Sequence, residues 1–216
     1  MKKIYLYEWT SWLFQNIIYF PCRFVLKYRV GLKIENETVL DDHKNPLLLA
    51  VAPHTNILDI IFVPAALPRH LLPVRWLADR NLFTRWYKRI WLSLWGALPV
   101  GRSMTGRFEE GGKDLILQML NKKHAVAIFP ECCLIGGSFS EIHQELFSSV
   151  INNNIAVVPI VMQGMKALKT RNLFWEKLNT ARIVFGTPIK KSDHQDWSPA
   201  SVMANIVEGF FLKNDA

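Results

Sequence analysis

The segment Leu47-Leu48-Leu49-Ala50-Val51-Ala52-Pro53-His54-Thr55-Asn56-Ile57-Leu58-Asp59 joins a continuous apolar run to a polar turn. A short apolar run of this kind is typical of a strand that is buried on both faces of a parallel sheet. His54 follows this strand, and Asp59 comes five positions after it. On one continuous helix, five positions amount to roughly 500° of rotation, which would point the two side chains about 140° apart. We therefore predict that His54 precedes a helix and that Asp59 lies within its first turns, so that the two side chains meet.

A histidine that contacts a carboxylate is a candidate general base. An imidazole titrates closest to neutrality of all side chains, and a carboxylate that fixes its tautomer prepares it to take a proton. Taken alone, a His and an Asp at this spacing are common by chance, and a purely structural histidine is the alternative interpretation. Three further blocks favour a functional site, because each lies within or at the end of a predicted strand, where α/β folds place ligand sites. These blocks are Gly101-Arg102, Phe129-Pro130-Glu131 and Val158-Pro159-Ile160.

The order of apolar segments indicates the fold class. Short apolar runs alternate with longer helical patterns, which predicts an α/β fold with a mixed, largely parallel central sheet flanked by helices. Strands are expected at residues 47–51, 74–78, 97–100, 125–129, 156–161 and 181–185. Helices are expected at residues 57–66, 82–95, 108–120, 141–151 and 198–211. The length of 216 residues favours one sizeable core, so we expect residues 31–216 to form a single domain behind an N-terminal segment at residues 1–30.

The N-terminal segment has a composition of its own. From Trp9 to Cys22 it carries no formal charge, but four polar residues interrupt the stretch. Its length falls short of the ~20 apolar residues that a spanning helix needs, and no small-residue cleavage site of a signal peptide follows. We predict that Ile4 to Tyr28 forms two short amphipathic helices, broken at Pro21, which lie in a membrane surface. The alternative is a helix that packs only on the protein.

Charge and aromatic content point to the same kind of surface. The net charge of +8 implies attraction to polyanions, and the eight tryptophans and thirteen phenylalanines favour an anionic membrane surface over nucleic acid, for which we find no motif. Charged residues make up 20% of the chain, which excludes a polytopic membrane protein. The three cysteines form no CxxC pair, which favours a reducing compartment. Together these features predict a peripheral protein on the cytoplasmic face of the inner membrane.

A second aromatic stretch follows the first predicted strands. Six apolar residues at helical spacing form one stripe with basic residues beside it. The stripe consists of Phe83, Trp86, Tyr87, Ile90, Trp91 and Leu94. It is either a core face with a solvated flank or a membrane-docking surface.

The four blocks, in this order, resemble the glycerolipid acyltransferase family, whose best-known members are the lysophosphatidic acid acyltransferases. The resemblance extends over about residues 45 to 190. His54 and Asp59 match the family's His-x4-Asp block, and the later blocks match at Gly101-Arg102, Phe129-Pro130-Glu131 and Pro159. The resemblance implies that residues 31–216 are an acyltransferase domain. It also implies transfer of a fatty acyl chain from acyl-CoA or acyl carrier protein to the hydroxyl of a lysolipid such as 1-acylglycerol 3-phosphate, with no metal and no cofactor.

The resemblance also implies roles for individual residues. His54 would act as the general base and Asp59 would orient it. Gly101, Arg102, Pro130 and Glu131 would bind the substrate.

The third block departs from the family pattern, because Cys132-Cys133 follow Glu131 where the family has Gly-Thr-Arg. An arginine at that place helps to hold the acceptor's phosphate, so its loss leaves three alternatives open. The acceptor could lack a phosphate, as an amino-acid-containing lysolipid does. A thiolate of Cys132 or Cys133 could carry the acyl group. The protein could also be an inert lipid-binding protein of the same fold.

Overall fold

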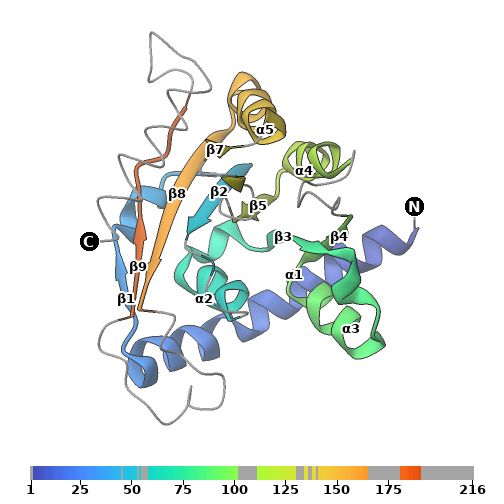
Figure 1. Ribbon diagram of the computed structural model, residues 1–216. Helices are drawn as coiled ribbons and strands as arrows, with labels where there is room; N and C mark the ends of the chain where they lie inside the picture. Colours follow the sequence, from blue (N-terminus) through green and yellow to red (C-terminus); the bar gives the residue numbers. More distant parts are fainter. Residues whose placement is uncertain are drawn as a thin grey trace.

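The computed structural model describes residues 2–44, 46–52, 54, 58–101, 111–129, 134–135, 138–139, 141–164 and 181–190. These residues form a seven-stranded sheet between two layers of helices (Figure 1). The strands are β1 (Lys33–Glu35), β2 (Leu47–Ala52), β3 (Val74–Asp79), β4 (Ala97–Val100), β5 (Ala125–Ile128), β8 (Ala156–Gln163) and β9 (Arg182–Phe185). A separate two-stranded sheet pairs β6 (Leu134–Ile135) with β7 (Ser138–Phe139).

Helices precede and connect the strands. They are α1 (Lys2–Phe24), α2 (Asp59–Ala66), α3 (Trp86–Leu94), α4 (Gly112–Asn121) and α5 (Glu141–Asn152). Shorter helical turns are η1 (Val25–Val30), η2 (Glu37–Leu40), η3 (Arg69–Leu71) and η4 (Arg80–Phe83). No helix among the described residues is both long and apolar enough to cross a bilayer.

The large sheet is mixed and mainly parallel. Its strand order is β1-β9-β8-β2-β5-β3-β4, and every neighbouring pair is parallel except β8 with β9. The five strands from β8 to β4 therefore end at the same edge of the sheet. The predicted α/β class with a largely parallel sheet is confirmed.

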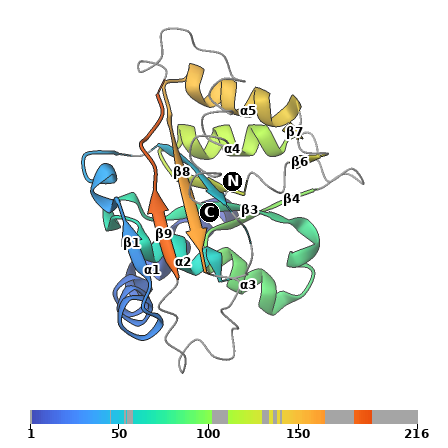
Figure 2. The ribbon, with the colours of Figure 1, turned by 60° about the vertical axis from the view of Figure 1, so that its left-hand side comes forward.

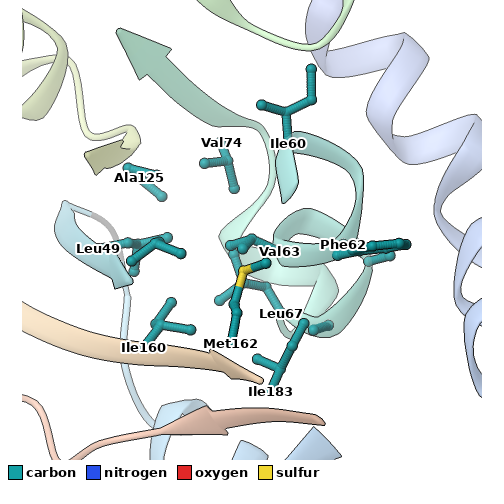
Figure 3. Close-up of a cluster of buried hydrophobic side chains, with 14 of the residues drawn as sticks. Leu49, Ile60, Phe62, Val63, Leu67, Val74, Ala125, Ile160, Met162 and Ile183 are labelled. Atoms are coloured by element: carbon teal, nitrogen blue, oxygen red, sulfur yellow. The ribbon is translucent and has the colours of Figure 1, made fainter. Parts of the chain in front are cut away.

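Two apolar cores lie on opposite faces of the sheet. Because neighbouring residues of a strand point to opposite faces, Leu49 and Val51 of β2 join the core shared with α1 and α2, while Leu48 and Ala50 join the core shared with α4 and α5. Figure 2 shows α4 and α5 together on one side of the sheet. Figure 3 shows how Phe62, Val63 and Leu67 of the α2 region pack with side chains from several strands.

Most predicted elements are present, with shifts of a few residues at their ends. All six expected strands form, and the helices expected at residues 57–66, 108–120 and 141–151 correspond to α2, α4 and α5. The helix expected at residues 82–95 begins with η4 and continues as α3. The helix expected at residues 198–211 lies outside the described residues.

The prediction of two N-terminal helices broken at Pro21 is wrong. Pro21 lies inside α1, which continues to Phe24 before the backbone widens into the π-helical turn η1. A proline in a helix loses one backbone hydrogen bond. Residues on both sides of Pro21 bind the C-terminal end of α2. Tyr19 donates to the Leu67 carbonyl, and Arg23 donates to the carbonyls of Ala65 and Ala66. These contacts keep the helix on the end of α2 across the proline.

Candidate active site

His54 and Asp59 meet at the carboxyl end of the central strand β2. His54 lies between β2 and α2, and Asp59 is the first residue of α2. The imidazole Nδ1 lies 2.8 Å from Oδ2 of Asp59. The aspartate side chain is fully buried, whereas the histidine side chain is 36% exposed. Asp59 therefore lies at a helix N-terminus, where acidic side chains are commonly found.

This contact determines which ring nitrogen can act as a base. A carboxylate accepts hydrogen bonds, so the neutral imidazole donates its Nδ1–H to Asp59. The basic lone pair is then on Nε2. Because the aspartate is buried and anchored at the start of a helix, it fixes both the tautomer and the orientation of the His54 ring.

An aromatic stack supports the histidine from another strand. The ring of Phe129, directly after β5, lies parallel to the His54 ring at a centroid distance of 3.9 Å. Phe129 also stacks with Trp76 of β3, at a centroid distance of 5.2 Å. The sequence analysis quoted Phe129 as part of a motif without giving it a role, and it did not assign Trp76 to the site. The position of Phe129 at the end of an apolar run was the available signal.

A cleft of about 330 Å³ opens beside His54. Its walls are mainly apolar. Besides His54 they comprise Ile60, Trp76, Leu77, Ala78, Asp79, Leu82, Leu92, Ala97 and Phe129. The indole Nε1 of Trp76 is buried and has no hydrogen-bond partner among the described residues, so it can donate to a bound molecule. A cleft with apolar walls and a few polar groups suits a substrate with an acyl chain and a reactive polar end.

The other predicted site residues are only partly described. Gly101 is buried directly after β4, whose carboxyl end lies at the same sheet edge as that of β2. Arg102, Pro130 and Glu131 lie outside the described residues, and so do Cys132 and Cys133. Cys22 is described as a free cysteine on α1, and burial raises the pKa of its thiol, which makes it a poor nucleophile.

Comparison with known proteins adds two findings. The chain matches the family model described as Acyltransferase over residues 31–163. Among solved structures it is similar to the 1-acyl-sn-glycerophosphate (LPA) acyltransferase PlsC from Thermotoga maritima, with a TM-score of 0.57 and 11% sequence identity over 90% of this chain and 79% of that chain. At this identity the similarity establishes a shared fold. No curated protein matches the chain.

Proposed function

The chain belongs to the acyltransferase family, and from that premise we propose that it is an O-acyltransferase of membrane lipid biosynthesis. It moves a fatty acyl chain from acyl-CoA or acyl carrier protein to the hydroxyl of a lysophospholipid-type acceptor. The observation that carries this proposal is the 2.8 Å contact between His54 and a fully buried Asp59 beside an apolar cleft. The solved structure that shares the fold is an acyltransferase for 1-acyl-sn-glycerophosphate, which supports an acceptor of this class.

The proposed reaction needs one general base and no enzyme nucleophile. Nε2 of His54 removes the proton from the acceptor hydroxyl while the hydroxyl oxygen attacks the carbonyl carbon of the thioester. Asp59 stabilises the imidazolium that forms. As the tetrahedral intermediate collapses, the C–S bond breaks, and the imidazolium returns the proton to the departing thiolate. The products are the new ester and a free thiol.

The third block bears on the acceptor's head group, because Cys132-Cys133-Leu134 stand where the family pattern has Gly-Thr-Arg, with its phosphate-binding arginine. We propose a phosphate-bearing acceptor, with Arg102 as a binding residue. A guanidinium suits phosphate because it can form two parallel hydrogen bonds. An amino-acid-containing lysolipid is the alternative acceptor, and both should be offered to the enzyme.

We also propose that the enzyme docks on an anionic membrane surface through an aromatic face on α1, η1 and α3. This aromatic face consists of Trp9, Trp12, Ile17, Phe20, Phe24, Tyr28, Trp86, Tyr87, Ile90 and Trp91, each of which is at least 46% exposed. The two helices are in contact, and Phe14 packs edge-on against Trp91 and Trp95 between them. The outward side of a helix in water is normally polar, so this much exposed aromatic surface indicates a partner.

The charges around the aromatic face favour an anionic bilayer as that partner. Exposed basic residues accompany the aromatic side chains on η1 and at α3: Lys27, Arg29, Arg85, Lys88 and Arg89. Tryptophan and tyrosine prefer the head-group region of a bilayer, and each basic residue near an anionic leaflet contributes about 1 kcal/mol. Of the two interpretations of the stripe, the core face does not fit its residues on α3, because Trp86 is 75% exposed and Ile90 is 53% exposed, while Leu92 and Trp95 are buried.

Release of free thiol from acyl-CoA and from acyl carrier protein tests the proposed reaction. The purified protein should release thiol when lysophosphatidate is supplied and should release none without an acceptor. Substituting His54→Ala should lower the rate about 10²- to 10⁴-fold, because a positioned base contributes a factor of this size. Asp59→Asn should also lower the rate, because the amide leaves the imidazolium without its counter-charge.

His70→Ala is the matched control, because His70 is an exposed histidine bonded to the His43 carbonyl. It should keep the native rate. A His54→Ala protein that transfers acyl groups as fast as this control would disprove the role of His54. If the native protein releases no thiol with either acceptor, it is an inert lipid-binding protein. Loss of activity on replacing Cys132 and Cys133 by alanine would favour the thiolate mechanism instead.

A further inference from the structure

A buried arginine without a matching carboxylate lies on the strand that also carries Trp76. Arg75 of β3 is 2% exposed. One guanidinium nitrogen, Nη2, donates to the backbone carbonyl of Glu8 at 3.2 Å. Its Nε is buried with no hydrogen-bond partner among the described residues. Burial lowers the pKa of Arg75 to about 10, so the group is still a cation at neutral pH. A buried cation with an unused donor is costly unless an anion joins it.

Arg75 lines a cavity of about 200 Å³ at the edge of the sheet. β4 is the edge strand, and the cavity wraps around it between α1, α3 and α4. Its apolar walls include Phe83, Leu98 and Met119. Arg89 of α3 also lines the cavity and is exposed, so it lies where the cavity reaches solvent. The volume is small for a drug-sized ligand and suits a compact head group.

The charges around the cavity favour an anion. Glu8 is the acidic residue in its lining, and its carboxylate already pairs with Lys122 at a distance of 2.7 Å. His124 interacts electrostatically with Arg75 and Glu8. Burial lowers the pKa of His124 to about 4, so this side chain is neutral at pH 7. Glu8 also acts electrostatically on Arg75 and partly offsets the effect of burial on its pKa. The three cations Arg75, Arg89 and Lys122 thus share the single negative charge of Glu8 at this cavity, which leaves an excess of positive charge.

We propose that this cavity binds the phosphate group of a small phosphate ester, with Arg75 as the buried anchor and Arg89 at the entrance. Guanidinium groups match phosphate oxygens through parallel hydrogen bonds, and two of them suit a dianion. The apolar walls accept the carbon part of the ester. The ester is either a free one, such as glycerol 3-phosphate, or the head group of a lipid that reaches the cavity along α3.

The cavity is distinct from the cleft beside His54. Arg75 and Trp76 are neighbours on β3, so their side chains point to opposite faces of the sheet. Trp76 lines the cleft of His54, and Arg75 lines the edge cavity. The proposal therefore concerns a second binding site and does not rest on the role of His54.

Thermal unfolding of the full chain tests the site. A ligand that binds only the folded state raises the unfolding temperature, and the rise grows as the ligand concentration exceeds its Kd. The probes are inorganic phosphate, glycerol 3-phosphate and dihexanoyl phosphatidate, each compared with sodium chloride at the same ionic strength. At least one probe should stabilise the native protein. Stabilisation by glycerol 3-phosphate indicates a free ester as the ligand, and stabilisation by the phosphatidate alone indicates a lipid head group.

The variant Arg75→Met separates an anion site from a structural arginine. Methionine fills a similar volume without the charge, so without ligand this variant should unfold at the same temperature as the native protein or higher. Its affinity for the stabilising probe should fall about 10- to 100-fold, the loss expected for one charge-assisted contact. Arg89→Gln should weaken binding in the same direction and leave the unfolding temperature without ligand unchanged.

Two controls complete the experiment. Arg29→Met removes an exposed arginine on η1 and should bind the probe like the native protein. His54→Ala should also bind it unchanged, because the two sites are separate. The proposal is overturned if Arg75→Met is stabilised by the probes as much as the native protein is. It is also overturned if Arg75→Met is destabilised without ligand, or if His54→Ala abolishes binding.

Discussion

At the scale of single residues, two different contacts hold the ring of His54. Asp59 fixes the tautomer through Nδ1, and Phe129 covers one face of the ring at 3.9 Å. An imidazole held at one nitrogen can still rotate about its side-chain bonds, and the flat contact with Phe129 limits that rotation. Trp76 in turn stacks with Phe129. The reacting nitrogen is therefore positioned from β2, β5 and β3 together.

We expect Phe129→Leu to lower kcat of the proposed acyl transfer about 10- to 100-fold while changing KM for the acceptor little. Leucine keeps the apolar volume but loses the flat face, so the base is misplaced without loss of the binding cleft. Phe129→Tyr keeps the aromatic face and should retain most of the activity. Steady-state kinetics of both variants measure the effect. Equal kcat values for the leucine and tyrosine variants would show that stacking has no part in positioning His54.

Among the helices, α1 carries apolar side chains on both its protein-facing and its outward side, and Tyr19 belongs to the core. Its protein-facing side buries Ser11 and Gln15, and its outward side carries the aromatic face. Gln15 Nε2 donates to the carbonyls of Val74 and Trp95, and Gln15 Oε1 accepts from the backbone N–H of Val74. The close approach is possible because Gly96 lacks a side chain: a Cβ there would lie 2.3 Å from the Val74 carbonyl oxygen.

Gln15 is therefore expected to attach α1 to the start of β3. We predict that Gln15→Leu lowers the free energy of unfolding by about 2 to 5 kcal/mol, because it leaves buried backbone groups without partners. Chemical denaturation measures this change. Asn16→Ala is the control on the next position of the same helix, and it should change stability by less than about 0.5 kcal/mol. Equal losses for the two variants would contradict an anchoring role for Gln15.

The aromatic face gives a prediction for the two helices together. Binding to vesicles that contain an anionic lipid should weaken as salt is added, and Lys88→Gln should weaken it about fivefold, the effect of losing about 1 kcal/mol per basic residue. Lys44→Gln, an exposed lysine outside the aromatic face, is the control and should bind normally. Replacing Trp86 and Phe20 by serine should weaken binding further. Vesicle sedimentation measures the binding of all variants. If the affinity for the vesicles does not change with salt, the proposed electrostatic contribution to membrane binding is wrong.

At the scale of the whole molecule, the parallel strands concentrate chemistry at one sheet edge while helices cover both faces. His54, Phe129 and Gly101 each follow the carboxyl end of a parallel strand, although they are far apart in the sequence. The opposite end of β5 has another environment: His124 precedes it, close to Arg75 and Glu8. Burial first, and then the charge of Arg75, lowers the pKa of His124 to about 4.

This shift predicts how stability depends on pH. The unfolded chain binds a proton at His124 near pH 6.5, whereas the folded chain binds it near pH 4, so the folded state loses stability as pH falls through this window. The loss from this residue should reach roughly 2 to 3 kcal/mol. Denaturation at several pH values should show a smaller loss for His124→Gln than for the native protein. Identical pH profiles would show that His124 is equally exposed in both states.

The sequence by itself determined the fold class, the main strands and helices, and the meeting of His54 with Asp59. These follow from local properties: apolar runs and helical spacing reflect burial along one segment, and His54 and Asp59 are five positions apart in the sequence. The strands of the α/β sheet were recognisable because parallel strands are apolar throughout. The strand β1, at residues 33–35, was not predicted, because an edge strand with both polar and apolar residues lacks a continuous apolar run.

Which side of each helix faces the core, and which distant residues meet, depends on how the elements pack in three dimensions. Pro21 does not break α1 because the end of α2 holds the helix on both sides of it. Trp86 and Ile90 are exposed although their spacing equally fits a core face, since periodicity identifies a face without saying what covers it. Phe129 reaches His54, and Trp76 reaches Phe129, because β5 pairs with β2 on one side and with β3 on the other. Such contacts join segments far apart in the chain, and no local pattern encodes them.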